Sequence, residues 1–488
     1  MNNPFRASLR APRAHPLHGA LGLALALAMP GASASAPLST AGARMTENVI
    51  PRDGTATGMH GRRARAGVAS ARTDARPSGA VVVENCNDAG PGSLREALDG
   101  AVDNDVVDLT NLVPCTISLE GDIFISADNL RVLGPGPGRL VVDGAQSNGM
   151  LAHLGEGTFS LEGMTIANGK YTSDHGVRGG CVYSTGNVVL TDVVVSGCAT
   201  YAQGAAFAMG GGVFAFGSVT LVDSDVRNST ALAGGSGLAF GGGVYAGAGL
   251  AAFNSTISGN QAAASTPGLS SYGGGAWSVL GNNTIVDSTI SGNGAAHAAG
   301  LALYGTSFQT RIVQSTVSGN RSTMGASGMH VASGNILIRN STITANVHDV
   351  ADSGIAGAGL EIPAAFDARL DGNILAGNFI DNGKYLPYDF RHGGAAVIGS
   401  SNLATSSAAS LPVDTIIVDD ARLGPLADNG GRTQTHAPLA DSPAIGRGNN
   451  LEDLPEDQRG SPREVGRPDV GSVEFDDALF VDGFETRG

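Results

Sequence analysis

Short aliphatic runs alternate with turn residues through the middle of the chain, and the alternation repeats. Four copies of one motif, Ser-Thr-(Ile or Val)-(Ser or Thr)-(Gly or Ala)-Asn, begin at Ser255, Ser288, Ser315 and Ser341. Weaker copies continue its aliphatic position at intervals of 26 to 33 residues, through Ile166, Val195, Val226, Ile257, Ile290, Val317, Ile343 and Leu375. A fixed period of about thirty residues is typical of a solenoid with one short unit per coil.

A second motif, a glycine-rich step before a short apolar run, follows the same period. Its copies are Gly179-Gly-Cys-Val-Tyr183, Gly210-Gly-Gly-Val-Phe214, Gly241-Gly-Gly-Val-Tyr245 and Gly273-Gly-Gly-Ala-Trp277. Each repeat has room for two or three short strands. It has no helix of the kind that ankyrin or leucine-rich units need, and a propeller blade needs four strands in about 40–45 residues. We therefore predict an all-β fold, a right-handed parallel β-helix that forms a single-stranded solenoid.

Stacking of the coils assigns a direction to each side chain of the motif. The aliphatic residues form an internal column, and the serines two places earlier share that inward face because side chains alternate along a strand. Thr256, Thr289, Thr316 and Thr342 then point outward. Asparagine tolerates the left-handed bend that ends a strand, and its amide can bond the amide in the next coil. We expect a structural asparagine ladder, made of Asn260, Asn293, Asn320, Asn346 and Asn378.

The two ends of the chain differ from the repeats. Residues 1–36 run from basic to apolar to small, with Ala32-Ser33-Ala34 as a cleavage site, which predicts a signal peptide. Residues 37–78 predict a disordered linker, 79–420 the β-helix, 421–475 a C-terminal cap module, and 476–488 a tail. Ser93-Leu-Arg-Glu96 is a capping box, so we expect an amphipathic helix that covers the N-terminal end of the solenoid.

Composition narrows the range of partners. Glycine makes up 73 of 488 residues, charged residues are only 15%, and the hydrophobic share of 42% is enough for a core. The net charge is −15, although the first 76 residues hold ten arginines and only three acidic residues. An acidic body repels nucleic acid, so we expect no nucleic-acid partner. No segment after the signal peptide reaches eighteen apolar residues, and we therefore expect no transmembrane segment after cleavage.

Four cysteines would enter an oxidising compartment if the chain is exported. Their spacing favours two disulfide bonds, Cys86 with Cys115 and Cys181 with Cys198. Four cysteines allow three connectivities, and free thiols are the alternative.

The segment Cys86-Asn-Asp-Ala-Gly-Pro-Gly-Ser-Leu-Arg-Glu-Ala97 resembles the N-terminal SLREA-type segment of secreted bacterial right-handed parallel β-helix proteins. Five further stretches resemble the terminal module called choice-of-anchor Q: Leu423 to Gly431, His436, Ser442 to Ile445, Asp457 to Gly460, and Asp469 to Glu474. This resemblance covers about residues 80–475. It implies the pectin-lyase-like fold and an exported, often surface-associated protein, but no settled activity. The stretch Leu479 to Glu485 is similar to a short tail on exported proteins of some proteobacteria, which implies a sorting signal.

Catalytic candidates are few. Asp174-His175-Gly176 resembles one catalytic motif of the polygalacturonases, but the accompanying paired-Asp and Arg-x-Lys motifs are missing. Asp389, Arg391 and His392 form a second polar cluster. The glycine triplets do not match a phosphate-binding loop, and no spacing matches a metal site, so we expect neither a cofactor nor a metal.

One pattern predicts binding. If Val182, Val213, Val244 and Ala276 point inward, their neighbours Tyr183, Phe214, Tyr245 and Trp277 point outward, one above another, as a platform for sugar rings. The loops before the glycine steps are apolar, with Phe207, Phe240 and Tyr272, and we favour the alternative that these loops fold over the rings and bury them. We therefore predict an exported, extracellular or surface-associated protein of the binding or adhesion type that contacts glycans. The alternative function is a polysaccharide lyase or glycoside hydrolase with an unfamiliar active site. The oligomeric state is not predicted.

Overall fold

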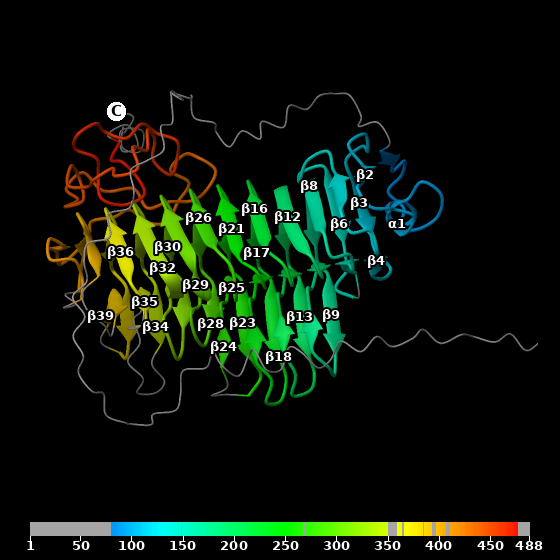
Figure 1. The fold of residues 1–488 in the computed structure, drawn as a ribbon, viewed down its shortest axis with the longest axis horizontal. Coiled ribbons are helices and arrows are strands. Elements are labelled where there is room, and N and C mark those ends of the chain that lie inside the picture. Colours follow the sequence, from blue (N-terminus) through cyan, green and yellow to red (C-terminus); the bar gives the residue numbers. More distant parts are fainter. Residues whose placement is uncertain are drawn as a thin grey trace, which may run out of the picture. The chain divides into compact units, whose positions relative to one another are not determined.

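The computed structural model describes residues 80–147, 149–266, 270–349, 359–363, 366–383, 385–392, 397–406 and 410–476. The predicted signal peptide, the linker and all of the tail except Asp476 lie outside the described residues. The described chain belongs to one compact unit, Thr73–Gly488. It is a parallel β-solenoid, as the repeat predicts, and its coils follow one another along one axis (Figure 1).

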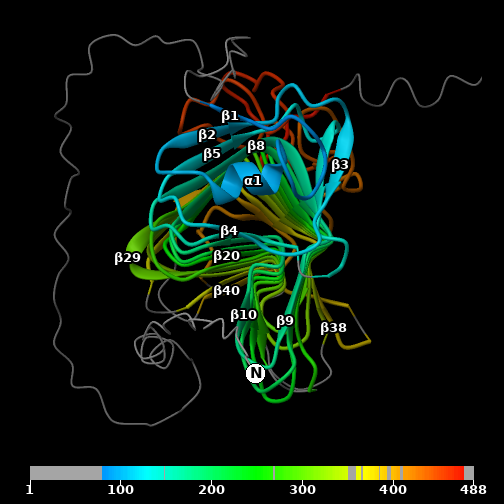
Figure 2. The same ribbon diagram turned by 90° about the vertical axis from the view of Figure 1, so that its right-hand side faces the viewer.

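Each complete coil passes through up to five columns of stacked strands, seen end-on in Figure 2. Column 1 follows the glycine step and holds β4 (Ile123–Ile125), β7 (Leu151–His153), β11 (Val182–Ser184), β15 (Val213–Ala215), β20 (Val244–Ala246), β25 (Ala276–Ser278), the first parts of β29 (Leu301–Val313) and β32 (Met329–Arg339), β35 (Leu360–Ile362) and β40 (Phe390–His392). Column 2 holds β1 (Val81–Val82), β2 (Asp105–Asp108), β5 (Leu130–Leu133), the first parts of β8 (Thr158–Ala167) and β12 (Asn187–Ser196), β16 (Val219–Val222), β21 (Leu250–Phe253), β26 (Asn283–Val286), the later parts of β29 and β32, β36 (Ala368–Asp371) and β41 (Ile398–Ser400).

Column 3 carries the asparagine motif and holds β3 (Cys115–Ser118), β6 (Leu140–Asp143), the later parts of β8 and β12, β17 (Asp225–Arg227), β22 (Thr256–Ser258), β27 (Thr289–Ser291), β30 (Thr316–Ser318), β33 (Thr342–Thr344), β37 (Ile374–Ala376), β42 (Leu403–Ala404) and β43 (Ile416–Ile417). Column 4 holds β9 (Lys170–Ser173), β13 (Ala199–Ala202), β18 (Thr230–Ala233), β23 (Gln261–Ala264), β28 (Gly294–Ala295), β31 (Arg321–Ser322), β34 (Val347–Asp349), β38 (Phe379–Asp381) and the antiparallel β39 (Leu386–Pro387). Column 5 holds β10 (Val177–Arg178), β14 (Ala208–Met209), β19 (Ala239–Phe240) and β24 (Ser271–Tyr272).

The aliphatic residues of column 3 form one internal column. Ile257 pairs with Ile290, which pairs with Val317, and the register continues in both directions along all eight predicted positions. Each of the eight side chains is at most 1% exposed. The structure therefore confirms the period and the inward direction of this position.

The asparagine ladder forms as predicted. Each amide donates from Nδ2 to Oδ1 of the asparagine in the next coil, at 2.8–3.1 Å from Asn260 to Asn378. Each Oδ1 also accepts the backbone N–H of the preceding rung, as Asn320 does from Asn293. Asp389 closes the ladder, because its Oδ1 accepts from Asn378 at 2.9 Å. Buried polar groups are tolerated here because nearly every donor and acceptor has a partner.

The ladder explains why two motifs share one period. The third glycine of the step packs against the asparagine amide, so a Cβ at Gly243 would lie 2.8 Å from Nδ2 of Asn260. The same holds at Gly300, where a Cβ would lie 3.0 Å from Nδ2 of Asn320. A side chain at either glycine would displace the ladder, so the glycine and asparagine positions depend on each other.

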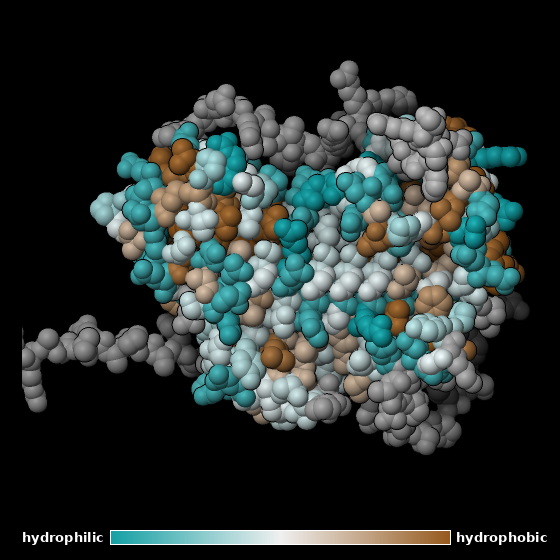
Figure 3. Space-filling model, turned by 180° about the vertical axis from the view of Figure 1, so that it is seen from behind, coloured by the Kyte–Doolittle hydropathy of each residue, from teal (hydrophilic) through white to brown (hydrophobic). Residues whose placement is uncertain are grey.

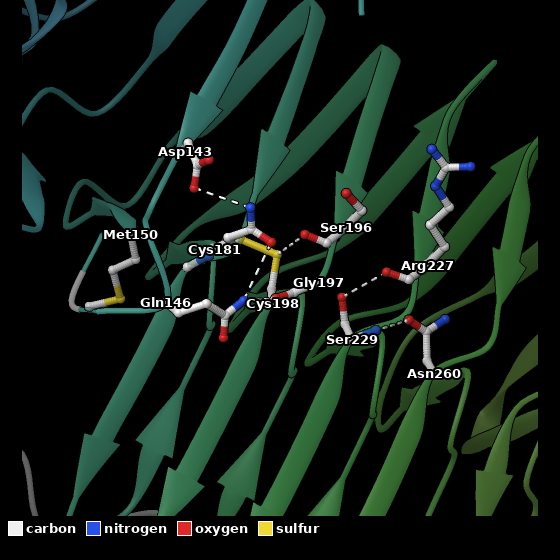
Figure 4. The surroundings of a disulfide bond; sticks show 12 residues. Asp143, Gln146, Met150, Cys181, Ser196, Gly197, Cys198, Arg227, Ser229 and Asn260 are labelled. Atoms are coloured by element: carbon white, nitrogen blue, oxygen red, sulfur yellow. Dashed lines mark hydrogen bonds between the residues drawn. A yellow bond between two sulfur atoms is a disulfide. The ribbon is translucent and has the colours of Figure 1, made fainter. Parts of the chain in front are cut away.

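Both predicted disulfide bonds are present. The Cys86–Cys115 bond ties the segment before the helix to β3, with Cα atoms 6.4 Å apart, and the Cys181–Cys198 bond has a Cα separation of 5.6 Å (Figure 4). Cys181 occupies the position of Gly243, and Cys198 occupies that of Asn260, two coils earlier. This disulfide therefore replaces the glycine–asparagine contact at the first coil of the repeat.

Helix α1 (Leu94–Asp99) forms where the capping box predicts it. The Ser93 hydroxyl accepts the backbone N–H of Glu96 at 3.2 Å, and the Glu96 carboxylate accepts the N–H of Gly92 at 2.7 Å. Leu94 and Leu98 are buried in the main core. The helix lies at the N-terminal end of the coils (Figures 1 and 2). No helix in the described residues is both long and apolar enough to cross a bilayer.

The segment 421–476 packs along the side of column 3. Thr289 donates to the carbonyl of Gln434, Thr316 donates to Oε1 of Gln458 at 2.7 Å, and Ser318 bonds His436 at 2.7 Å. The predicted outward direction of the threonines is correct, but Thr289, Thr316 and Thr342 are at most 1% exposed. Most of the threonine face is therefore an internal interface.

Figure 3 shows the molecule from the side opposite to Figure 1. Residues of near-neutral hydropathy extend across the middle of this rear side.

Candidate ligand-binding site

Column 1 brings the four predicted aromatic residues into direct register on its outer side. Tyr183 pairs with Phe214, Phe214 with Tyr245, and Tyr245 with Trp277. The first three rings stack, with centroids 5.5 Å apart for Tyr183 and Phe214 and 4.8 Å apart for Phe214 and Tyr245. The sequence therefore predicted the positions of these rings correctly.

The rings do not form an open, flat platform. Column 5 meets column 1 at the glycine step, and its outward residues Phe240 and Tyr272 pack edge-on against Trp277, with ring centroids 4.9 and 5.2 Å from it. Phe214 is 0% exposed and Tyr245 6%, whereas Tyr183 and Trp277 are half-buried. Much of the surface is therefore covered, as the alternative interpretation held. We call this set of rings the aromatic corner. It consists of Tyr183, Phe214, Tyr245 and Trp277 of column 1 and of Phe240 and Tyr272 of column 5.

The glycine step makes the corner possible. Gly210 has φ +61°, a left-handed conformation, and a Cβ there would lie 2.3 Å from the carbonyl oxygen of Val213. Only glycine lets the chain turn from column 5 into column 1 this sharply. The turn brings the outward side chains of both columns together.

The corner is an apolar environment for the groups within it. Burial raises the pKa of Tyr245 to about 12, against a smaller opposing effect of the Arg178 charge. Burial likewise raises the pKa of Tyr183, and Arg178 again opposes the shift. Burial lowers the pKa of His297, which stacks on Tyr272 at 4.8 Å, to about 4. These hydroxyls and this imidazole are therefore neutral at pH 7.

Two donors in the corner have no hydrogen-bond partner. They are the indole Nε1 of Trp277 and Nε of Arg178, both buried atoms of half-buried residues. The guanidinium of Arg178 lies 5.8 Å from the ring centroid of Phe214 and 5.6 Å from that of Phe216. Unpaired buried donors are uncommon in a folded protein, and a bound water or ligand is one way in which such a donor finds an acceptor.

The outward row of column 1 continues from Trp277 through Ala302 to three polar residues. His330 Nδ1 lies 3.3 Å from Oε2 of Glu361, and Arg391 donates to Oε1 of Glu361 at 2.6 Å. Burial alone would raise the pKa of Glu361, but the His330 hydrogen bond and the charges of His330 and Arg391 lower it overall. Glu361 is therefore an ionised, paired carboxylate.

The other catalytic candidates do not converge. Asp174 and His175 are exposed on the loop between β9 and β10. Asp389 is 0% exposed, and its second oxygen accepts from Thr405 and Ser406, so it serves the asparagine ladder. Arg391 points outward to Glu361, whereas His392 bonds the carbonyl of Ile362 at 3.0 Å. In the described part of the chain, no three His, Cys, Asp or Glu side chains cluster as metal ligands.

The sequence analysis missed Arg178, Tyr304 and the His330–Glu361 pair. Arg178 could have been found by comparing the repeats. It is the one charged residue at a column 5 position that Met209, Phe240 and Tyr272 occupy in the following coils. The ring centroids of Tyr304 and Trp277 lie 4.7 Å apart. They meet because β29 is longer than the corresponding strands of the other repeats, and no local sequence pattern indicates this length.

Comparison with known proteins gives a distant structural likeness. No family model matches the chain, and no curated protein matches its sequence. The chain is similar to the crystal structure of pectate lyase Pel9A at 12% sequence identity and a TM-score of 0.45. The match covers 81% of this chain and 97% of that one. This likeness is too weak to assign an activity.

Proposed function

We propose that this protein is an exported β-solenoid that binds a polysaccharide at the aromatic corner. The observation that carries the proposal is Trp277, a half-buried indole among Phe240, Tyr272 and Tyr304 whose buried N–H has no partner. A sugar supplies what this site lacks, since its C–H faces pack on aromatic rings and its oxygens accept hydrogen bonds.

The dimensions of the corner fit an extended ligand. From Tyr183 to Trp277 it crosses four coils, and stacked strands are about 4.8 Å apart, so it extends roughly 15 Å along the axis. The residues at its two ends, Tyr183 and Trp277, are half-buried, whereas Phe214 and Tyr245 between them are buried. We propose that a chain of a few sugar units lies along this row.

Export rests on three features. The basic-apolar-small order of residues 1–36 is typical of a secretory signal. Two disulfide bonds suit an oxidising compartment. The tail residues 476–488 are proposed to act as a sorting signal, and deletion of residues 477–488 would then change where the protein accumulates without changing its thermal stability.

A polysaccharide lyase or hydrolase is the second candidate, and the contacts among His330, Glu361 and Arg391 favour it. A hydrolase needs two carboxyl groups about 5–9.5 Å apart across the scissile bond. In the described residues, Glu361 is the one acidic side chain in the outward row of column 1. A binding role therefore fits this row better. A polysaccharide cleavage activity lost in Glu361→Gln would favour the enzyme instead.

Trp277 is the sole tryptophan of the chain, so its fluorescence tests the proposal. Titration with alginate, xylan, dextran and dextran sulfate should give a saturable change in emission with at least one of them. Trp277→Phe keeps an aromatic ring but loses the N–H. Its affinity, measured by affinity electrophoresis, should fall about 5- to 20-fold, as for loss of one hydrogen bond.

Phe124→Ala is the matched control. Phe124 lies in the same outward row but two coils before Tyr183, and it is 58% exposed. Its removal should leave binding unchanged. Equal losses in Phe124→Ala and Trp277→Phe, or no saturable binding to any of the four polysaccharides, would contradict the proposal.

A further inference from the structure

Arg178 differs from every other arginine in the described residues. Eleven of the sixteen form an ion pair with a carboxylate. Four of the remaining five are exposed to solvent, namely Arg139, Arg227, Arg447 and Arg467. Arg178 is half-buried, pairs with no carboxylate, and has a buried Nε without a partner.

The surroundings of Arg178 hold its guanidinium in place without neutralising it. Phe214 and Phe216 meet edge to face at 4.9 Å, and the guanidinium lies within 6 Å of both rings. Contact with aromatic faces compensates part of the cost of removing a cation from water. This contact leaves the N–H groups of the guanidinium available for an acceptor. The face of an aromatic ring attracts the positive charge but offers few acceptor atoms to the N–H donors.

Among the described residues, no carboxylate forms an ion pair with Arg178. Arg391 and Glu361 neutralise each other at the far end of the row. The chain as a whole carries a net charge of −15. The aromatic corner is thus a locally cationic site on an acidic protein, and such a site recruits anions that the rest of the surface repels.

We propose that Arg178 is the specificity-determining residue of the aromatic corner and that it binds an oxyanion on the polysaccharide, either a carboxylate or a sulfate ester. This inference rests on the proposed function and narrows it to acidic polysaccharides. A planar guanidinium fork matches the two oxygens of such a group. Tyr183, which follows Arg178 in the same coil, lies close enough for the Arg178 charge to influence its hydroxyl.

Dextran, carboxymethyl dextran and dextran sulfate share one backbone, so together they isolate the effect of the anion. Affinity electrophoresis of the full chain at 0.15 M NaCl should show retardation by at least one charged dextran and little by dextran itself. The charged polymer that binds more tightly identifies carboxylate or sulfate as the preferred group. In Arg178→Met, which keeps an unbranched apolar stem against the rings, the affinity for that polymer should fall about 10- to 100-fold.

Arg227→Met is the matched control, because Arg227 is an exposed arginine without an ion pair in column 3. It should lose less than twofold. Arg178→Lys keeps the charge but not the fork, so it should lie between the wild type and Arg178→Met. Circular dichroism and thermal unfolding establish that each variant is folded. If the Met variant fails to fold, the Lys variant decides the question.

The outcomes separate the two proposals. Equal losses in Arg178→Met and Arg227→Met would show a general charge effect and overturn the role of Arg178. Binding of neutral dextran or xylan that depends on Trp277 but not on Arg178 would also overturn it, while the proposed function would stand. If no polysaccharide, charged or neutral, binds the wild type, both proposals are wrong.

Discussion

Asn320 lies in the middle of the asparagine ladder, and its amide takes part in bonds to both neighbouring coils. Its Nδ2 donates to Asn346 Oδ1 and to the carbonyl of Ile290, and its Oδ1 accepts from the side chain and backbone of Asn293. Asn320→Ala should lower the free energy of unfolding by about 2–4 kcal/mol, because buried groups of two coils lose their partners. Urea unfolding checks this, and exposed Asn87→Ala should change it by less than about 0.5 kcal/mol.

His297 makes stability depend on pH. Burial depresses its pKa to about 4, opposed by Glu361 and reinforced by His330 and His348. In the unfolded chain the pKa is about 6.5, so the unfolded state binds the extra proton between pH 6.5 and pH 4. The contribution of a neutral His297 is therefore complete above pH 6.5 and is lost as the pH falls toward 4.

Urea titrations at pH 7 and pH 4.5 measure this loss. Between these pH values, the free energy of unfolding should fall by about 2–3 kcal/mol more in the wild type than in His297→Gln. His175→Gln, at an exposed position, should keep the full pH dependence. An identical loss in His297→Gln and the wild type would mean that another group is responsible.

Helix α1 buries Leu94 and Leu98 against the main core at the N-terminal end of the coils. If it caps the solenoid, Leu98→Ala should both destabilise the protein by about 2–5 kcal/mol and promote self-association through the exposed coil edge. Light scattering after size exclusion measures the association. Asp99→Ala, on the exposed side of the same helix, should do neither. Destabilisation without association would limit the helix to a packing role.

The segment 421–476 is held by a small apolar cluster, in which Ala421, Ala444 and Val470 pack against column 3, and by polar contacts. Gln458 is central to the polar contacts. Its Nε2 donates to the carbonyl of Ser288 and to the hydroxyls of Thr289 and Thr433, at 3.0–3.2 Å, and its Oε1 accepts from Thr316. Gln458→Ala should therefore speed proteolysis within this segment at least several-fold while the coils stay resistant. Exposed Arg467→Ala is the control. Unchanged proteolysis in Gln458→Ala would show that other contacts suffice.

The repeated elements were predictable because equivalent positions recur in successive repeats and can be aligned with one another. The period gave the aliphatic column and the asparagine ladder, and alternation along a strand gave the directions of Thr316 and Tyr183. The covering of Thr316 by Gln458 was not predictable, since the two lie 142 residues apart and nothing local marks the contact. The covering of Trp277 by Phe240 and Tyr272 agrees with the interpretation that the apolar loops favoured. The sequence does not give the angle between columns 5 and 1, which decides how far each ring is covered.

The coils of the solenoid satisfy most of their own buried polar groups. The repeats bury Ser, Thr and Asn side chains in ladders, and the C-terminal segment covers most of the threonine face. Among the buried polar atoms of the described residues that lack a hydrogen-bond partner, Nε1 of Trp277 and Nε of Arg178 belong to the aromatic corner, whereas Thr200 Oγ1 and Thr415 Oγ1 lie elsewhere. We therefore propose that a ligand binds at the aromatic corner and not on the threonine face or the exposed loops.

Hydroxyl-radical footprinting of the full chain, with and without the polysaccharide that binds most tightly, tests this placement at single residues. We predict that oxidation of Tyr183, Phe216, Tyr272 and Trp277 falls on binding. Oxidation of Phe124 and Tyr385, which are 58% and 62% exposed, should stay constant. Protection of Phe124, Tyr385 or residues of 421–476, with no change at Trp277, would contradict the account.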